Sequence, residues 1–118
     1  MHKDWVKMAE TLNGTMGDLR KGIPDVMKGF GQTAGAANAE GQALDPKTKE
    51  LIALAIGVAI RCDGCICFHA KAAVEKGATR EEVEQTLGVC VYMGGGPSAV
   101  YGSQALEAFD QFKAAAGK

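Results

Sequence analysis

The sequence predicts an all-α protein, a bundle of helices, from three observations. No segment alternates apolar and polar residues over enough positions to indicate a strand. Helix-starting residues recur along the chain, and each is followed by apolar residues at helical spacing. The chain has 16 glycines but only one Trp, two Tyr and four Phe. We therefore expect helices that pack closely through small residues.

The N-terminal third contains two predicted helices. The first covers residues 4–12 and is expected to end at Asn13-Gly14, a common turn signal. The second covers residues 24–38 and opens with Pro24, which favours the first helical position. Three glycines inside this second segment lower its intrinsic helix propensity.

The third predicted helix begins at Asp45-Pro46, an N-cap followed by a proline at the first helical position. It should run to about residue 61. Residues 51–60 are apolar on every side of this helix, which predicts burial all round. A chain of this length has few residues with which to cover such a helix, so we expect a partner subunit to cover it.

Three more helices follow. The fourth comes after an interruption at Asp63-Gly64 and should end near residue 76, before Gly77. The fifth begins at the capping box of Thr79 and Glu82 and should end at the three glycines that follow residue 93. The last is predicted over residues 97–115.

Length and charge restrict the classes of function. A chain of 118 residues fits one domain, which we expect to cover residues 1–118. The net charge of −1 gives no reason to expect nucleic acid or an acidic membrane as a partner. The charges at the N-terminus have no apolar run behind them, and the longest apolar run is half the length of a membrane span. We expect a soluble, cytoplasmic protein.

Cys62 and Cys65 form a C-x-x-C motif at the opening of a predicted helix. A helix N-terminus presents unpaired N–H groups and partial positive charge, which stabilise a thiolate. Residues three apart lie on one face of a helix, close enough for a disulfide. His69 follows four residues after Cys65 and returns to the same face, so it could take the thiol proton and return it to a leaving group. The competing interpretation is two buried structural cysteines and a hydrogen-bonded histidine.

Other interpretations concern the remaining cysteines. Cys67 points to another side of the helix, and Cys90 lies in an apolar run, so we expect both in the core. Cys62, Cys65, Cys67 and His69 include the ligand types of a zinc or iron–sulfur site. We do not expect a metal, because four groups on one short helix cannot easily surround an ion and no second ligand pair exists.

Glu50 begins the apolar helix, where a carboxylate is costly unless it is paired. From the residues alone, an exposed first-turn carboxylate and a functional group are equal alternatives. The spacing of Glu50 from the C-x-x-C motif and His69 favours a functional group, by analogy with a known family. Glu50, eleven residues, Cys62-x-x-Cys65, three residues and His69 resemble the AhpD-like alkylhydroperoxidase branch of the carboxymuconolactone decarboxylase superfamily.

The resemblance extends from residue 50 to residue 97 and implies an all-α, trimeric or hexameric protein that reduces hydroperoxides or disulfides. It implies that Cys65 attacks the peroxide, that Cys62 resolves the product, and that Glu50 and His69 relay protons. The sequence departs from the family inside the C-x-x-C motif, and Cys67 is likewise not part of the family pattern and could act as a third redox thiol. Known peroxide-reducing members have an additional His inside the C-x-x-C motif, whereas this chain has Asp63-Gly64, and Asp63 should oppose a thiolate. A protein disulfide is therefore also open as the substrate.

The sequence thus predicts a cysteine-based antioxidant oxidoreductase. The chain has no nucleotide motif for a flavin or nicotinamide cofactor, so a separate donor, thioredoxin-like or lipoyl-bearing, is expected to reduce the Cys62–Cys65 disulfide. Two alternatives stay open. One is a decarboxylase or isomerase of a small lactone acid, with His69 and Glu50 as acid and base. The other is an oligomeric redox-sensing protein without catalytic activity.

Overall fold

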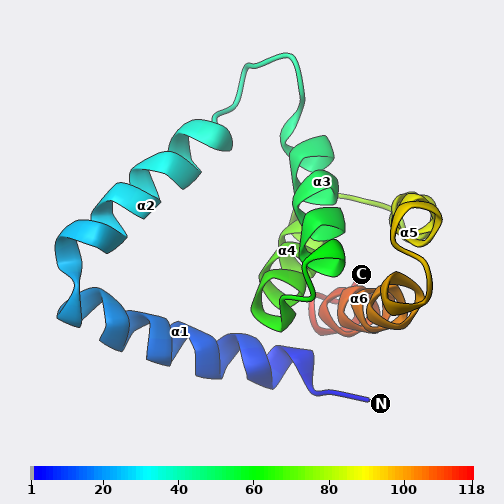
Figure 1. Ribbon diagram of the computed structural model, residues 1–118, viewed down its shortest axis with the longest axis horizontal. Helices are drawn as coiled ribbons and strands as arrows, with labels where there is room; N and C mark the ends of the chain where they lie inside the picture. The colour runs from blue at the N-terminus through cyan, green and yellow to red at the C-terminus, as the bar shows by residue number, and fades with distance from the viewer. Residues whose placement is uncertain (1) are drawn as a thin grey trace.

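The protein is described by a computed structural model that covers residues 2–118. Six helices follow one another along the chain (Figure 1): α1 (Trp5–Gly22), α2 (Pro24–Ala37), α3 (Pro46–Ala59), α4 (Asp63–Glu75), α5 (Arg80–Gly94) and α6 (Gly96–Ala115). No strand occurs among the described residues. The all-α prediction is confirmed. None of these six helices is both long enough and apolar enough to cross a membrane.

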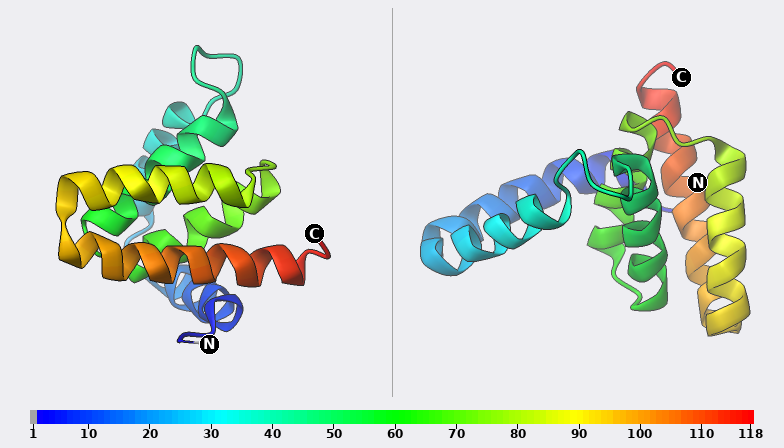
Figure 2. Two further views of the ribbon diagram at one scale, coloured as in Figure 1. Left: turned by 90° about the vertical axis from the view of Figure 1, so that its right-hand side faces the viewer. Right: turned by 90° about the horizontal axis from the view of Figure 1, so that it is seen from above.

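Four helices form the packed body, and two form an arm. In the body, α3 packs against α4, α5 against α6, and α4 also against α6. The start of α1 packs on α4 and α6, and α1 and α2 then extend away from the body, as Figure 1 and the right view of Figure 2 show. Among the helices, α2 packs against α1 alone. The loop after α2 is tied to α3 through Lys49, whose Nζ donates to the carbonyl oxygens of Ala37 and Ala39 at 2.9 and 3.1 Å.

The core lies where α1, α3, α4, α5 and α6 meet. Its largest fully buried side chains come from all five of these helices: Trp5, Leu54, Val58, Ile66, Cys67, Val83 and Phe109. Helix α2 contributes no buried residue. The core therefore surrounds α4, the helix that carries the C-x-x-C motif at its N-terminal end.

Helix α1 is longer than predicted. It passes through Asn13-Gly14 and ends at Gly22, so the expected stop after Leu12 is wrong. Leu12 lies against the backbone of Gly64 in α4, because a Cβ built on that glycine would be 3.3 Å from Leu12 Cδ1. Tertiary packing of this kind overrides the weak local preference of a turn signal. The helix ends instead just before Pro24, which disfavours helical backbone at the preceding residue.

The chain reverses direction between α3 and α4 through a Schellman motif. The Cys62 N–H donates to the Gly57 carbonyl at 3.0 Å, and the Arg61 N–H donates to the Val58 carbonyl at 3.2 Å. Arg61 has a φ of 58°, the left-handed conformation that this motif requires and that glycine usually supplies. The reversal therefore occurs before Asp63-Gly64, which lie in the first turn of α4 and do not break the helix.

The other predicted boundaries agree closely with the structure. The capping box at the start of α5 is present, with Thr79 Oγ1 accepting from the Glu82 N–H and Glu82 Oε1 accepting from the Thr79 N–H. Gly77 ends α4 with a φ of 82°. Helix α6 begins one residue before Pro97, after Gly95 turns the chain with a φ of 69°.

Helix α3 is not buried on every side within one chain. Leu54, Gly57 and Val58 face the core, whereas Ile52 and Ile56 are half exposed and Ile60 is more so. The predicted all-round burial is therefore incomplete in a single subunit. The exposed residues recur every fourth position, which places them on one apolar stripe.

Candidate active site

Cys62 and Cys65 lie at the N-terminal mouth of α4. Cys62 is the N-cap, and its Sγ accepts a hydrogen bond from the Cys65 N–H at 3.2 Å. The two residues form a disulfide, with their Cα atoms 5.2 Å apart. Both are half buried. The sulfur of Cys62 thus occupies the position where free helix N–H groups and the helix dipole stabilise negative charge.

Gly57 allows α3 to lie directly against this motif. A Cβ on Gly57 would be 3.2 Å from the Cβ of Cys65 and 3.4 Å from the backbone N of Ile66. Any side chain at this position would push the two helices apart. Sequence reasoning missed Gly57, although a lone glycine inside an otherwise apolar helix is a signal of close packing.

Glu50 and His69 form a pair across α3 and α4. His69 Nδ1 lies 2.8 Å from Glu50 Oε2. The Glu50 side chain is 13% exposed and that of His69 is 35% exposed. A proton on Nδ1 would be donated to the carboxylate, which leaves Nε2 free to exchange protons with a reacting group. Glu50 is therefore not a free first-turn carboxylate, and the reversal after α3 is what brings it to the motif-bearing helix.

The spacing on α4 sets the relation between the pair and the thiols. His69 lies one turn after Cys65, a spacing at which Cβ atoms are about 5–6 Å apart. The structure thus places Cys65 against Gly57 of α3 and His69 against Glu50 of α3, while Cys62 caps α4. Their catalytic roles remain predictions.

Asp63 has a partner that the sequence did not reveal. Lys3 Nζ lies 2.5 Å from Asp63 Oδ2, from the segment that precedes α1. No motif at the N-terminus signals this contact, because it joins residues 60 positions apart.

Cys67 and Cys90 lie in the core, as predicted. Cys67 is fully buried, and its Sγ donates to the Trp5 carbonyl at 3.2 Å. Burial raises the pKa of the Cys67 thiol to about 11. Burial also raises the pKa of Cys90, whose Sγ lies 3.7 Å from the Ala55 carbonyl oxygen. Burial thus disfavours the thiolate, which is the reactive form, at both positions.

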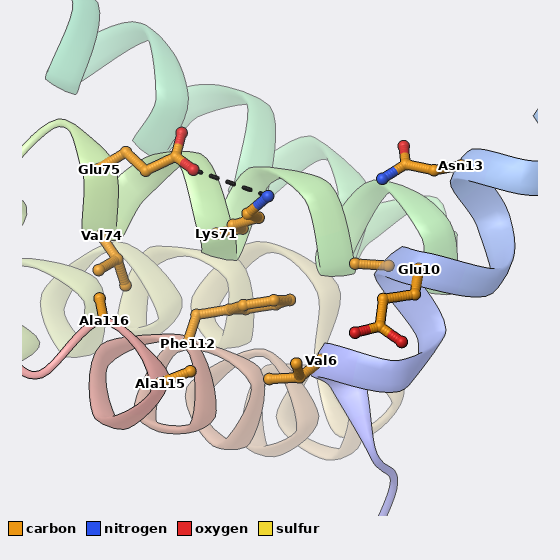
Figure 3. Close-up of a pocket in the computed structure, with 10 residues that line it drawn as sticks. Val6, Glu10, Asn13, Lys71, Val74, Glu75, Phe112, Ala115 and Ala116 are labelled. Carbon is orange, nitrogen blue, oxygen red and sulfur yellow. Dashed lines mark ion pairs between the residues drawn. The ribbon is translucent and has the colours of Figure 1, made fainter.

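Within residues 2–118, no group of three or more His, Cys, Asp or Glu side chains is arranged to hold a metal ion. A cavity of about 280 Å³ lies elsewhere, between α1, the C-terminal half of α4 and the end of α6 (Figure 3). Val6, Val74 and Phe112 line it, and the ion pair of Lys71 and Glu75 lies beside them. It contains none of the four predicted site residues.

Comparison with known proteins places this arrangement in a family. The family model described as the carboxymuconolactone decarboxylase family matches residues 24–108. The chain belongs to the carboxymuconolactone decarboxylase family. This match covers α2 to α5 and most of α6, and so includes Glu50, both motif cysteines and His69.

Solved structures and curated proteins agree with that membership. A carboxymuconolactone decarboxylase family protein from Legionella pneumophila is 49% identical, with a TM-score of 0.88 over 92% of this chain and 96% of that one. A Thermotoga maritima protein is 26% identical, with a TM-score of 0.76 over 96% of each chain. An uncharacterized protein of Haemophilus influenzae is 40% identical over 97% of this chain and 100% of its own length. An uncharacterized protein of Cupriavidus necator is 40% identical over 87% of this chain and 90% of its own length.

Proposed function

We propose that this member of the carboxymuconolactone decarboxylase family is a thiol oxidoreductase of the AhpD-like type, which reduces hydroperoxides with Cys62 and Cys65. The observation that supports the proposal is that α4 carries the Cys62–Cys65 disulfide at its mouth and, one turn after Cys65, a histidine paired with Glu50. A redox pair and an acid–base pair together are what peroxide reduction by thiols needs.

The cycle begins with the Cys65 thiol. His69 accepts its proton at Nε2 while Glu50 holds Nδ1, and the thiolate attacks one peroxide oxygen. The O–O bond breaks, the sulfur is oxidised to a sulfenic acid, and the leaving alkoxide takes the proton from His69 to become an alcohol. The Cys62 thiol then attacks the sulfenic sulfur, which forms the disulfide and releases water.

A dithiol donor closes the cycle. It reduces the disulfide by exchange, attacking one sulfur, forming a mixed disulfide and leaving as its own disulfide. A thioredoxin-like or lipoyl-bearing protein has this chemistry. By the same kind of thiol–disulfide exchange, the reduced Cys62–Cys65 pair would reduce the disulfide of another protein instead of a peroxide.

We also propose that the protein works as a homo-oligomer, a trimer or a hexamer, in which a second copy covers the apolar surface left open by one chain. Helix α2 has 14 residues, none of them buried, and its Val26 and Phe30 are 65% and 62% exposed. An isolated helix of this length is marginal in water, so α2 needs a further packing partner. The stripe of Ile52, Ile56 and Ile60 on α3 offers a second apolar surface.

One observation favours a second candidate function. The Glu50–His69 pair is an acid–base pair that does not need the thiols, and it could move protons on a small lactone acid during decarboxylation or isomerisation.

A turnover assay separates these candidates. Peroxide consumption is measured with a dithiol donor for the wild type, for Cys62→Ser, for Cys65→Ser and for the matched control Cys90→Ser. The proposal expects turnover in the wild type and in Cys90→Ser and its loss in the other two. Lactone consumption that survives in a Cys62→Ser/Cys65→Ser double variant, without peroxide turnover in the wild type, would favour the second candidate. A disulfide that forms and breaks without turnover of either substrate would indicate a redox sensor.

A further inference from the structure

The segment before α1 is attached firmly to the body of the protein. Glu107 on α6 accepts from the backbone N–H of Lys3 at 2.9 Å and from Trp5 Nε1 at 2.8 Å. Gln111 accepts from the Trp5 N–H at 2.8 Å and donates to the Lys3 carbonyl at 2.7 Å. Trp5 is fully buried. These contacts fix residues 2–5, which we name the N-terminal strap.

The strap touches the redox helix at two points. The Trp5 carbonyl accepts from Cys67 Sγ in the second turn of α4. Lys3 Nζ reaches Asp63 Oδ2 in its first turn, and the same ammonium lies 5.4 Å from the centre of the Trp5 ring. The Lys3 ammonium is therefore held in place, because its backbone is fixed in the strap and the charge itself contacts Asp63 and the Trp5 ring.

Asp63 occupies a sensitive position. It is the first helical residue of α4 and lies between Cys62, the N-cap, and Cys65. A carboxylate that is free at this point can turn toward the unpaired N–H groups of the first turn, the groups that stabilise a thiolate. Its negative charge would also repel a thiolate directly.

We propose that Lys3 is a positioning residue for the redox pair: by holding and neutralising Asp63, it keeps that carboxylate from opposing the thiolate at Cys62 and Cys65. The reduced state is stabilised as a result, and the disulfide becomes a stronger oxidant, because the oxidising strength of a dithiol pair follows the stability of its reduced form. The proposal rests on the proposed function only in taking Cys62 and Cys65 as a reversible redox pair.

The test is the thiol–disulfide equilibrium of the intact protein with glutathione at pH 7, with the oxidised and reduced forms counted by mass after acid quenching. No peroxide is present, so the result does not depend on peroxidase activity. Lys3→Met should lower the equilibrium constant for reduction of the protein disulfide roughly two- to fivefold, the scale of one partly exposed ion pair. Lys3→Arg should restore it, because the guanidinium carries the same charge.

Two further variants decide whether Lys3 acts through Asp63. In an Asp63→Asn background, Lys3→Met should change the logarithm of the equilibrium constant by less than half as much as it does in the wild-type background. Lys7→Met is the matched control. It also removes one lysine charge, but from a side chain that pairs with Glu10 and not with Asp63, so it should leave the constant unchanged.

Trp5, the only tryptophan, reports by its fluorescence whether the strap stays in place. A red shift in Lys3→Met would mean that the strap has come loose. In that case the Asp63→Asn single variant replaces it as the test, and Asp63→Asn should raise the equilibrium constant. Equal effects of Lys3→Met in both backgrounds, an equal effect of Lys7→Met, or no effect of either Lys3→Met or Asp63→Asn would overturn the proposal.

Discussion

Glu50 Oε2 lies 2.8 Å from His69 Nδ1, although 19 residues separate the two along the chain. In one straight helix, Glu50 and Cys62 would be about 18 Å apart along the axis. The Schellman motif at the end of α3 removes that separation, since α4 then runs back beside α3. One chain therefore brings Glu50 to the redox helix, without a residue from a neighbouring subunit.

This pairing predicts an acid–base defect on mutation. Glu50→Gln and His69→Gln should each slow peroxide reduction by ~10²-fold or more, the usual scale of a lost acid–base group, while the fold is retained. The pH at which Cys65 alkylates rapidly should rise in both variants. Glu84→Gln on exposed α5 is the control and should behave as the wild type. Full activity and an unchanged alkylation profile in Glu50→Gln would remove Glu50 from the relay.

Replacing Arg61 with glycine should stabilise the fold. Its left-handed backbone is costly for any residue with a Cβ, and Gly77 occupies the equivalent position at the end of α4 at no such cost. Arg61→Gly should raise the free energy of unfolding by about 1 kcal/mol, and Gly77→Ala should lower it by a similar amount. Denaturant titration measures both. A lower stability of Arg61→Gly would show that the arginine side chain makes a contribution larger than its backbone strain.

The attachment of the N-terminal strap to Glu107 should weaken in acid. Its hydrogen bonds from the backbone N–H groups of His2 and Lys3 and from the Trp5 indole lower its pKa to about 2, below the usual 4.5 of a glutamate. A carboxyl whose pKa is lower in the folded state contributes stability above its unfolded pKa and loses it as the pH falls through the folded value. The advantage of the wild type over Glu107→Gln should therefore be complete near neutral pH and disappear between about pH 4.5 and pH 2.

Unfolding midpoints measured across this range, followed by Trp5 fluorescence, give the result. Glu10→Gln on exposed α1 is the matched control and should show no such convergence. A constant difference between the wild type and Glu107→Gln at every pH would mean that the charge of Glu107 does not hold the strap.

The exposed stripe on α3 predicts association. Light scattering at micromolar concentration should give a multiple of the 12.3 kDa subunit. Ile56→Glu places a charge in the middle of the stripe and should shift the protein toward smaller species, whereas Lys76→Glu, beyond the end of α4, should not. A monomer of wild-type protein at that concentration would contradict the proposed assembly.

The local signals in the sequence were sufficient for most of the fold. Asp45-Pro46, the capping box at Thr79 and the glycine at position 77 each act within one turn of a helix, so the sequence alone located those helix ends. The stop expected at Asn13-Gly14 failed because Leu12 packs on α4, a contact between distant parts of the chain. Likewise, nothing within a turn of Arg61 marks it as a residue with positive φ.

The candidate site divides in the same way. The spacing of Cys62, Cys65 and His69 along one helix was enough to group them. Glu50 could be joined to them only by a family resemblance, because its contact depends on the reversal of the chain. Gly57 and Lys3 were missed, since both act through close approach between separate elements.

Peroxide reduction by Cys62 and Cys65 is tested by a single-turnover reaction of the reduced protein with an organic hydroperoxide and no donor, with thiols counted and disulfides mapped by peptide mass. Each subunit should consume one peroxide and lose two of its four thiols, the disulfide should join Cys62 to Cys65, and Cys67 and Cys90 should stay reduced. Four thiols that survive exposure to the peroxide, or a disulfide that joins Cys62 to Cys90, would rule out this chemistry.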